Sequence, residues 1–550
     1  MAFSKARLHR KLEIMPVPVQ RPLRSAFVVT FAILFCGFLG MVFGQKTGED
    51  TTPAGINDLN DNLKEFSQVY EVVEQNYAEP VDAGKAIYNG AIPGMLRVLD
   101  PHSNFFDPKS YSALREDQRG RYYGVGMQVG PRNNKVIVIA PFVGSPAYKA
   151  GIRPGDAIIA VDGRPTDNMN TSDVAELLKG PKGTTVKITM LREGSEKPLT
   201  FTVVRDEIPR YSVDLHFFIR PGIGYLHITS FNENTEEEVG KALDEFGSDL
   251  KGLVLDLRQN PGGLLNEAVG VSDKFLAKGD VIVSHRGRSS PERVYRAAHG
   301  NGGKDYPLVV LVNKYTASAA EIVTGAIQDH DRGLVLGETT FGKGLVQTVY
   351  PLSDNTGLAL TTAKYYTPSG RLIQREYSGV SLYDYYYLRE GEDSTAGHEI
   401  KLTDSGRTVY GGGGITPDVK YESPKSNKFQ DEMAQQYVFF NFAKHFALGK
   451  QISKNFVVDD AVLQAFRMFL EQEKISYSQA DFLLNEDWLR RNIKSEIFVS
   501  EFGQESGLRV HAEEDPEVLK AIDLLPQARA LQENAKKIIA AHTQNSPLER

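Results

Sequence analysis

The chain has 550 residues, about three or four times the length of a typical domain, so we expect several packed units joined by linkers. Hydrophobic residues make up 41% and charged residues 24%, which excludes a disordered, collagen-like or polytopic membrane chain. With 63 Lys and Arg against 70 Asp and Glu, the net charge of -7 argues against a nucleic-acid partner, and the single cysteine, Cys36, excludes intrachain disulfides and paired-thiol chemistry.

The N-terminal region carries a membrane signal. Residues 1–25 are rich in Lys and Arg, and they precede an uncharged apolar run at 26–44 that is about long enough to cross a bilayer. Because basic flanks stay in the cytoplasm, the rest of the chain is predicted to be exported and anchored on the periplasmic side of the cytoplasmic (inner) membrane. A cleavable signal peptide is the alternative, although no A-x-A site follows. A lipoprotein use of Cys36 is disfavoured because bulky Leu34 and Phe35 precede it.

Four further regions follow along the chain. At 56–108 the apolar residues recur at steps of three and four, which predicts a helical N-terminal region. Residues 109–205 are dense in glycine and β-branched residues, with strand-like pieces VIVIA, AIIAVDG and TVKITML, and form a small β-rich module. At 206–424, strands such as GYLHI, GLVLDL and PLVVLV alternate with helical segments, as in an α/β layer structure. Residues 425–550 have helical spacing and predict a helical C-terminal domain.

The β-rich module contains a candidate peptide-binding loop. YYGVGMQVG places a Gly-x-Gly turn just before a strand, where backbone N–H groups can meet an anion. The following GSPAYKAGIRPGDAIIAVDGRP resembles the signature of PDZ domains, which implies that this loop holds a peptide's C-terminal carboxylate while the next strand adds the peptide as a β-strand. The alternative is that the glycines serve only tight turns. The loop residues implied by the resemblance are Tyr123, Gly124, Val125, Gly126 and Met127.

A serine at a strand-to-helix elbow is the first candidate catalytic residue. PLVVLVNKYTASAAEIVTGAIQD predicts a buried strand, a short turn and a helix, with Ser318 at the junction. There its hydroxyl is exposed, the helix N-terminus favours developing negative charge, and the N–H of Ala319 is free to donate. A helix N-cap is the alternative role for this serine or for Thr316.

A nucleophilic serine needs a base at neutral pH, and none of the eleven histidines lies in a recognisable triad motif. GETTFGKGLVQTVYPL instead offers Lys343 between two glycines, with Gln347 four residues later. Burial disfavours the charged form of a lysine, so a buried Lys343 could take the proton of Ser318 as a neutral amine. Its ordinary alternative is a solvated surface lysine.

These segments together resemble one enzyme family. VNKYTASAAEIVTGAIQD, TFGKGLVQ, LDLRQNPGGLL, GITPDV and LDPHSNFFDP are similar to motifs of the carboxyl-terminal processing proteases, which carry a PDZ domain and a Ser-Lys dyad. The resemblance implies a multidomain α+β fold, with the PDZ module inserted before an α/β ClpP/crotonase-like serine protease core and with helical N- and C-terminal regions. It implies Ser318 as nucleophile, Lys343 as general base and acid, and Gln347 as the residue that orients Lys343.

The segment LDLRQNPGGLL adds candidate oxyanion donors. Gly262 and Gly263 follow a buried strand and can bring their N–H groups to a substrate carbonyl, so they are predicted to form an oxyanion hole with Ala319. Which glycine donates stays open. Asp256 and Arg258 flank the same turn and are predicted to form an ion pair that fixes the loop rather than an acid–base pair.

The resemblance implies cleavage of exported proteins near or from their C-termini by acyl transfer, a reaction that needs no metal or other cofactor. The predicted partners are proteins or peptides with apolar C-termini and the inner membrane, while the C-terminal helices are candidates for homodimer formation or for docking an adaptor protein. Two alternatives remain: an anchored PDZ scaffold that binds chain ends without catalysis, and an esterase with a histidine base.

Overall fold

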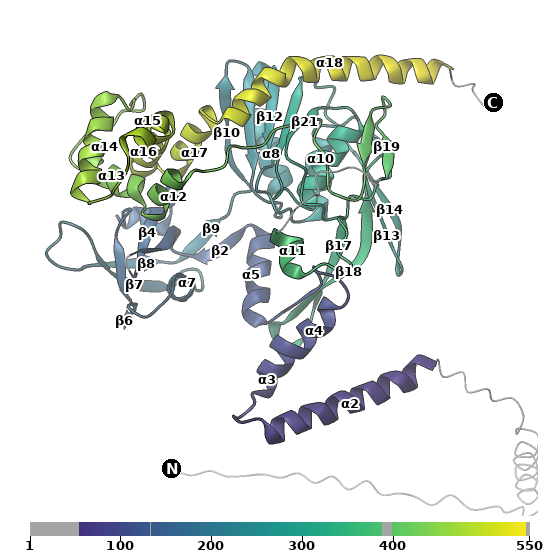
Figure 1. The fold of residues 1–550 in the computed structure, drawn as a ribbon, viewed down its shortest axis with the longest axis horizontal. Helices are drawn as coiled ribbons and strands as arrows, with labels where there is room; N and C mark the ends of the chain where they lie inside the picture. Colours follow the sequence, from purple (N-terminus) through teal and green to yellow (C-terminus); the bar gives the residue numbers. More distant parts are fainter. Residues whose placement is uncertain (1–53, 133, 388–398, 546–550) are drawn as a thin grey trace, which may run out of the picture. The chain divides into compact units, whose positions relative to one another are not determined.

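The computed structural model describes residues 54–132, 134–387 and 399–545 (Figure 1). The chain divides into two compact units, one up to Ile87 and one from Tyr88 onward. The predicted membrane segment at 26–44 lies outside the described residues. Within the described ranges, no helix combines the length and the apolar character that a membrane crossing requires.

The described part of the first unit consists of two helices. Helix α2 (Ala54–Asn76) confirms the helical spacing expected there, and α3 (Ala83–Ala86) is capped by Asp82, whose side chain accepts from the N–H of Lys85. The second unit opens with the π-helical turn η1 (Ile87–Ala91), which begins at the boundary, and with three short elements. They are α4 (Ile92–Arg97), β1 (Asn104–Phe106) and α5 (Pro108–Arg119).

The β-rich module is built on an antiparallel sheet with strand order β3-β4-β5-β7-β8. Its core consists mainly of small β-branched and aliphatic side chains, which matches the strand-like pieces of the sequence. Among the described strands β3 pairs only with β4, so its outer edge is open. The elements are β2 (Arg121–Gly124), β3 (Met127–Arg132), β4 (Lys135–Pro141), α6 (Pro146–Lys149), β5 (Ala157–Val161), β6 (Arg164–Pro165), α7 (Thr171–Leu178), β7 (Thr185–Leu191), β8 (Leu199–Val204) and β9 (Asp206–Pro209), which pairs with β2.

The α/β region is centred on a six-stranded sheet of order β10-β11-β12-β15-β16-β21, parallel from β11 onward. Strands β12 and β15 are buried at every position, as expected for a parallel sheet that is covered on both faces. The strands are β10 (Val213–Arg220), β11 (Ile223–Ile228), β12 (Gly252–Asp256), β15 (Leu308–Val312), β16 (Leu334–Gly337) and β21 (Val419–Lys420). Helices α8 (Thr235–Phe246), α9 (Leu265–Asp273) and α10 (Ala319–Asp329) pack on one face.

The last helix of the chain covers the other face of this sheet. Helix α18 (Pro516–Asn545) crosses the strands (Figure 1), and its apolar side chains Val518, Ala521, Leu524 and Leu525 pack against residues of β12, β15 and β16. Helix α18, although it belongs to the C-terminal helical region, therefore packs on the α/β sheet. The strands alone leave one apolar face uncovered, and this helix buries it.

A strand of a second sheet begins two residues after Lys343 and contains Gln347. Strand β18 (Gly357–Tyr366) pairs with β1, with β17 (Leu345–Pro351) and with β13 (Val281–Gly287), which in turn pairs with β14 (Ser290–Arg296). Helix α11 (Leu382–Tyr387) follows, and then the hairpin of β19 (Ile400–Leu402) and β20 (Thr408–Tyr410).

The predicted C-terminal helical domain is confirmed. Its core is rich in phenylalanine, with Phe466 and Phe482 fully buried. The helices are α12 (Lys428–Gln435), α13 (Val438–Ala447), α14 (Asp460–Gln472), α15 (Gln479–Leu484), α16 (Glu486–Phe502) and α17 (Gln504–Glu513), followed by α18.

Candidate active site

Ser318 lies at the junction predicted from the sequence, between β15 and α10, and it lines a cavity of about 970 Å³. Its backbone angles are φ 55° and ψ -115°, a conformation that costs a non-glycine residue about 1–3 kcal/mol. Such strain is typical of an elbow that lifts a side chain away from the backbone on both sides. Ser318 is the residue immediately before α10. It therefore occupies the N-cap position of the helix and the strand-to-helix elbow at the same time.

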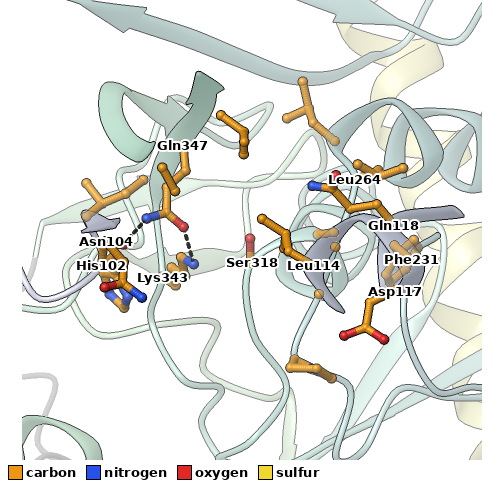
Figure 2. Close-up of a pocket in the computed structure, with 18 of the residues that line it drawn as sticks. His102, Asn104, Leu114, Asp117, Gln118, Phe231, Leu264, Ser318, Lys343 and Gln347 are labelled. Atoms are coloured by element: carbon orange, nitrogen blue, oxygen red, sulfur yellow. Dashed lines mark hydrogen bonds between the residues drawn. The ribbon is translucent and has the colours of Figure 1, made fainter. Parts of the chain in front are cut away.

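Lys343 and Gln347 line the same cavity as Ser318 (Figure 2). The Lys343 amine donates to Oε1 of Gln347 at 2.8 Å, and Nε2 of Gln347 donates to the carbonyl oxygen of His102. Figure 2 shows Ser318 between this row of polar groups and the apolar side chains of Leu114, Phe231 and Leu264 on its other side. The structure therefore brings the three predicted catalytic residues to one cavity. The hydrogen bonds of Gln347 connect Lys343 to the backbone of His102.

A single buried carboxylate joins the Ser318 elbow to the Lys343 loop. Glu321 is fully buried, and its two oxygens accept from the N–H of Ser318 at 2.7 Å and from the N–H of Lys343 at 2.9 Å. They also accept from the N–H of Gly342 at 2.7 Å and from the hydroxyl of Thr340 at 2.5 Å. With four donors on one carboxylate, the distance between the two loops is set by the size of a glutamate side chain.

Tyr365 joins the same two segments through their carbonyl groups. Its hydroxyl lies 3.1 Å from the carbonyl oxygen of Ser318 and also donates toward that of Lys343. Burial raises the pKa of Tyr365 well above 10, with nearby Glu321 acting in the same direction, so this hydroxyl stays a donor. Glu321 thus binds the N–H side of both loops and Tyr365 binds the carbonyl side.

The titration of Lys343 is displaced toward the neutral amine. Burial lowers the pKa of Lys343 below 10.5, while the charges of Glu321 and Asp100 oppose the shift. For Glu321, burial raises the pKa and the four hydrogen bonds oppose that shift. A lysine in this setting carries a larger fraction of neutral amine near neutral pH than a solvated lysine does.

The two glycines of the predicted oxyanion loop differ in their hydrogen bonds. The N–H of Gly262 donates to Oδ1 of Asn260 at 2.8 Å, whereas in the described parts of the chain the N–H groups of Gly263 and Ala319 donate to no other residue. Gly262 has φ 94°, and a Cβ there would lie 2.7 Å from the Cβ of Ser318. Gly262 is therefore needed for close contact with the elbow, and Gly263 carries the available N–H.

Asp256 and Arg258 form the ion pair predicted from the sequence, with an N–O distance of 2.6 Å. Burial would raise the pKa of Asp256, but the charge of Arg258 and the contribution of His227 hold it at about 2. Arg258 also binds Asp515 and Glu517 at the start of α18, at 2.9 Å each. The pair fixes the strand end that leads into the oxyanion loop.

In the β-rich module, the predicted carboxylate loop lies between β2 and β3. Gly124, Val125, Gly126 and Met127 are buried, and Tyr123 is 42% exposed. Gly126 has φ 76°, and its carbonyl oxygen accepts from the hydroxyl of Ser145 at 2.7 Å, while Val125 accepts from the N–H of Ala147. These bonds fix the turn at the end of the open edge of β3.

Three residues at the site were absent from the predicted set. Glu321 carries a sequence signal, because Ser318-x-x-Glu321 is a capping-box pattern. Tyr365 and His102 have no local signal that links them to Ser318. Among the described residues, no group of three or more His, Cys, Asp and Glu side chains is arranged to hold a metal ion.

Comparison with known proteins gives four domain matches. Peptidase family S41 matches residues 222–381, a PDZ domain matches 138–192, the activating protease CtpB N-terminal domain matches 41–110, and the C-terminal helical domain of a probable PDZ-protease matches 429–481.

Two named relatives align with more than half of the chain. The carboxy-terminal-processing protease of Bartonella bacilliformis is 42% identical over 318 residues, which are 57% of this chain and 72% of that protein. The carboxyl-terminal-processing protease of Synechocystis is 40% identical over 294 residues, which are 52% and 68% of the two chains. Among solved structures, the photosystem II D1 C-terminal processing protease is 31% identical, covers 64% of this chain and 86% of its own, and has a TM-score of 0.34.

Proposed function

Since the chain belongs to the carboxy-terminal processing proteases of peptidase family S41, and so is a serine-type peptidase with a PDZ domain, we propose that Ser318 and Lys343 form its catalytic dyad. The observation that carries this proposal is the carboxylate of Glu321, which binds the backbone of both residues. An ordinary solvated lysine would not be expected to share a buried carboxylate with a strained serine. The lowered pKa of Lys343 supports the same role.

The proposed reaction is acyl transfer. The neutral Lys343 amine removes the Ser318 proton as the hydroxyl oxygen attacks the peptide carbonyl, and Gln347 holds the amine in place through their 2.8 Å hydrogen bond. The N–H groups of Gly263 and Ala319 receive the oxyanion, with Gly262 allowing the close approach. The Lys343 ammonium then protonates the leaving amine, and the lysine afterwards activates the water that hydrolyses the ester.

We further propose that the PDZ domain selects the substrate by its C-terminus. The turn from Tyr123 to Met127 would take the terminal carboxylate, and the open edge of β3 would pair with the peptide as an added strand. The proposed substrates are exported proteins with apolar C-termini. The basic and apolar segments at 1–25 and 26–44 support anchoring of the enzyme at the periplasmic face of the inner membrane.

The test uses two peptides of the same sequence that end in an apolar residue. One has a free C-terminal carboxylate and the other has an amidated C-terminus. We expect cleavage of the free acid by the wild type, none by Ser318→Ala or Lys343→Ala, and slower cleavage of the amide because the carboxylate is missing. If the wild type cleaves no faster than Ser318→Ala while it still binds the free acid, the protein is a PDZ scaffold. Equal rates for both peptides would contradict selection by the carboxylate but not the dyad.

A further inference from the structure

His102 lies beside the proposed dyad, and the proposed reaction gives it no task. Its carbonyl oxygen accepts from the Gln347 amide, and both of its ring nitrogens meet tyrosine hydroxyls of α11. Nε2 lies 3.0 Å from the hydroxyl of Tyr385, and Nδ1 lies 3.3 Å from that of Tyr386. The ring also packs edge-on against Phe341, two residues before Lys343.

The backbone that presents the His102 carbonyl is fixed on both sides. Asp100 accepts from the N–H groups of His102 and Ser103 at 2.8 Å each, and from the Ser103 hydroxyl at 2.7 Å. The same hydroxyl accepts from the N–H of Thr361 on β18 at 3.1 Å, and β1 begins at the next residue and pairs with β18. The carbonyl therefore has a defined direction toward Gln347.

The hydrogen bonds around the ring select a neutral imidazole with its proton on Nδ1. Gln374 donates to the hydroxyl of Tyr385 at 3.1 Å, so the Tyr385 hydrogen is directed to Nε2 of His102. Tyr386 donates to the carbonyl oxygen of Pro101 at 2.9 Å, so its oxygen receives the proton on Nδ1. A protonated ring would have donors on both nitrogens and would compete with the Tyr385 hydrogen.

The balance of the charges that face this ring also favours the neutral form. They are Lys343 from the loop before β17, Arg375 from the segment after β18, and Asp100 from its own turn, together with the two tyrosine hydroxyls of α11. Burial, Lys343 and Arg375 lower the pKa of His102 to about 3 against the opposing charge of Asp100. The ring is thus neutral at every pH at which a lysine base can work.

We propose that His102 is a positioning residue of the dyad: α11 holds its neutral ring, its carbonyl holds the Gln347 amide, and Gln347 holds the Lys343 amine toward Ser318. The inference rests on the proposed Ser318–Lys343 dyad. It gives α11 a part in the active site through the hydroxyls of Tyr385 and Tyr386.

The chemical reason is the orientation of the Gln347 amide. An amide can rotate so that its oxygen and nitrogen exchange places, and the His102 carbonyl accepts only from the nitrogen. With the nitrogen fixed there, the oxygen faces Lys343 and takes one N–H of the amine. The lone pair of a neutral amine can then point to the serine. If His102 moves, the amide can turn its NH₂ group to Lys343, and this orientation is lost.

The test measures kcat and KM against pH for Tyr385→Phe, His102→Ala and the double variant. Tyr387→Phe is the matched control, because the Tyr387 hydroxyl belongs to an exposed residue of the same helix. We expect Tyr385→Phe to lower kcat by about 10-fold with KM within about 2-fold, and Tyr387→Phe to match the wild type. Adding Tyr385→Phe to His102→Ala should change kcat by less than about 2-fold, because the tyrosine acts through the histidine.

The pH profile separates positioning from a general structural effect. In His102→Ala, water enters the space beside Lys343 and relieves the burial that lowers its pKa, so the acid limb of kcat/KM should move to higher pH. His102→Gln, which can still accept from Tyr385, should recover part of the lost kcat. If His102→Ala does not fold, Tyr385→Phe and His102→Gln carry the same comparison.

The contrary results distinguish failure of the positioning role from failure of the dyad. If Tyr385→Phe and the His102 variants keep the kcat of the wild type and the acid limb of its kcat/KM profile, the positioning role is overturned and the dyad is left intact. Turnover retained in Lys343→Ala, with none in His102→Ala, would overturn both and make His102 the base. Independent, additive losses from Tyr385→Phe and His102→Ala would show that α11 does not act through this ring.

Discussion

Replacing Glu321 by Gln tests whether the dyad depends on the distance between its two loops. The substitution keeps the size of the side chain and leaves Ser318 and Lys343 unchanged. The carboxylate accepts four hydrogen bonds, two on each oxygen, and an amide offers only one acceptor oxygen. The amide oxygen is expected to face the two N–H groups of Ser318 and Lys343, because the NH₂ group then meets the Thr340 hydroxyl, which can accept, whereas a backbone N–H can only donate.

The magnitude follows from the bonds that remain unmade. Two hydrogen bonds to a charged acceptor are lost, at about 1.5–3 kcal/mol each, so the local loss is about 3–6 kcal/mol. The strained backbone of Ser318, which costs about 1–3 kcal/mol, is then held less firmly. If about half of the loss, about 1.5–3 kcal/mol, is expressed in the transition state, kcat falls by about 10- to 150-fold, because each 1.36 kcal/mol is tenfold in rate.

The assay compares kcat, KM and Tm of Glu321→Gln with those of the wild type and of Glu338→Gln. Glu338 is a matched control because it is only partly buried and accepts from the N–H of Lys314 rather than from that of Ser318 or Lys343. We expect a large fall in kcat, a small change in KM and a lower Tm for Glu321→Gln only. A kcat within about threefold of the wild type, at full occupancy of the folded state, would refute the spacing argument.

Three further predictions concern stability. Leu525→Ala should destabilise the protein by about 2–5 kcal/mol in denaturant unfolding, whereas Gln527→Ala at an exposed site of α18 should change it by less than about 0.5 kcal/mol. The pKa of Lys343 is lower in the folded than in the unfolded state, so the wild type gains stability as the pH rises from the folded pKa toward 10.5. Lys343→Met removes this buried charge and should therefore raise Tm most at pH 7 and progressively less toward pH 10. Arg258→Met should cost about 3–5 kcal/mol of unfolding free energy by leaving Asp256 buried and unpaired, and Asp256→Asn in the same chain should restore part of it.

The sequence was informative where function depends on local structure. The strand, turn and helix around Ser318 follow from one apolar run, a short polar turn and a helical pattern, and all three are confirmed. Lys343 could be selected because two glycines flank it. The Asp256–Arg258 pair could be predicted because the residues are close in sequence on a strand end, and the ion pair is confirmed.

Contacts between distant segments could not be predicted in this way. His102 meets Gln347 and the tyrosines of α11 only because β1 and β17 both pair with β18, which brings three separate segments to one edge of the cavity. Nothing in LYDYYY specifies that two of its hydroxyls face a histidine. The choice between Gly262 and Gly263 likewise depends on Asn260, whose side chain occupies one of the two N–H groups.

The sequence does permit one long-range expectation, which concerns the face of the sheet that α18 covers. GLVLD and LVVLV, the segments that form β12 and β15, are apolar on both faces, so their sheet needs helices on both sides. The helices between the strands, α8, α9 and α10, pack on one face. The second face then has to be covered by a later segment, and α18 supplies it. A helix that completes the core cannot at the same time offer the same apolar face to a partner, so any docking surface of the C-terminal region must lie elsewhere.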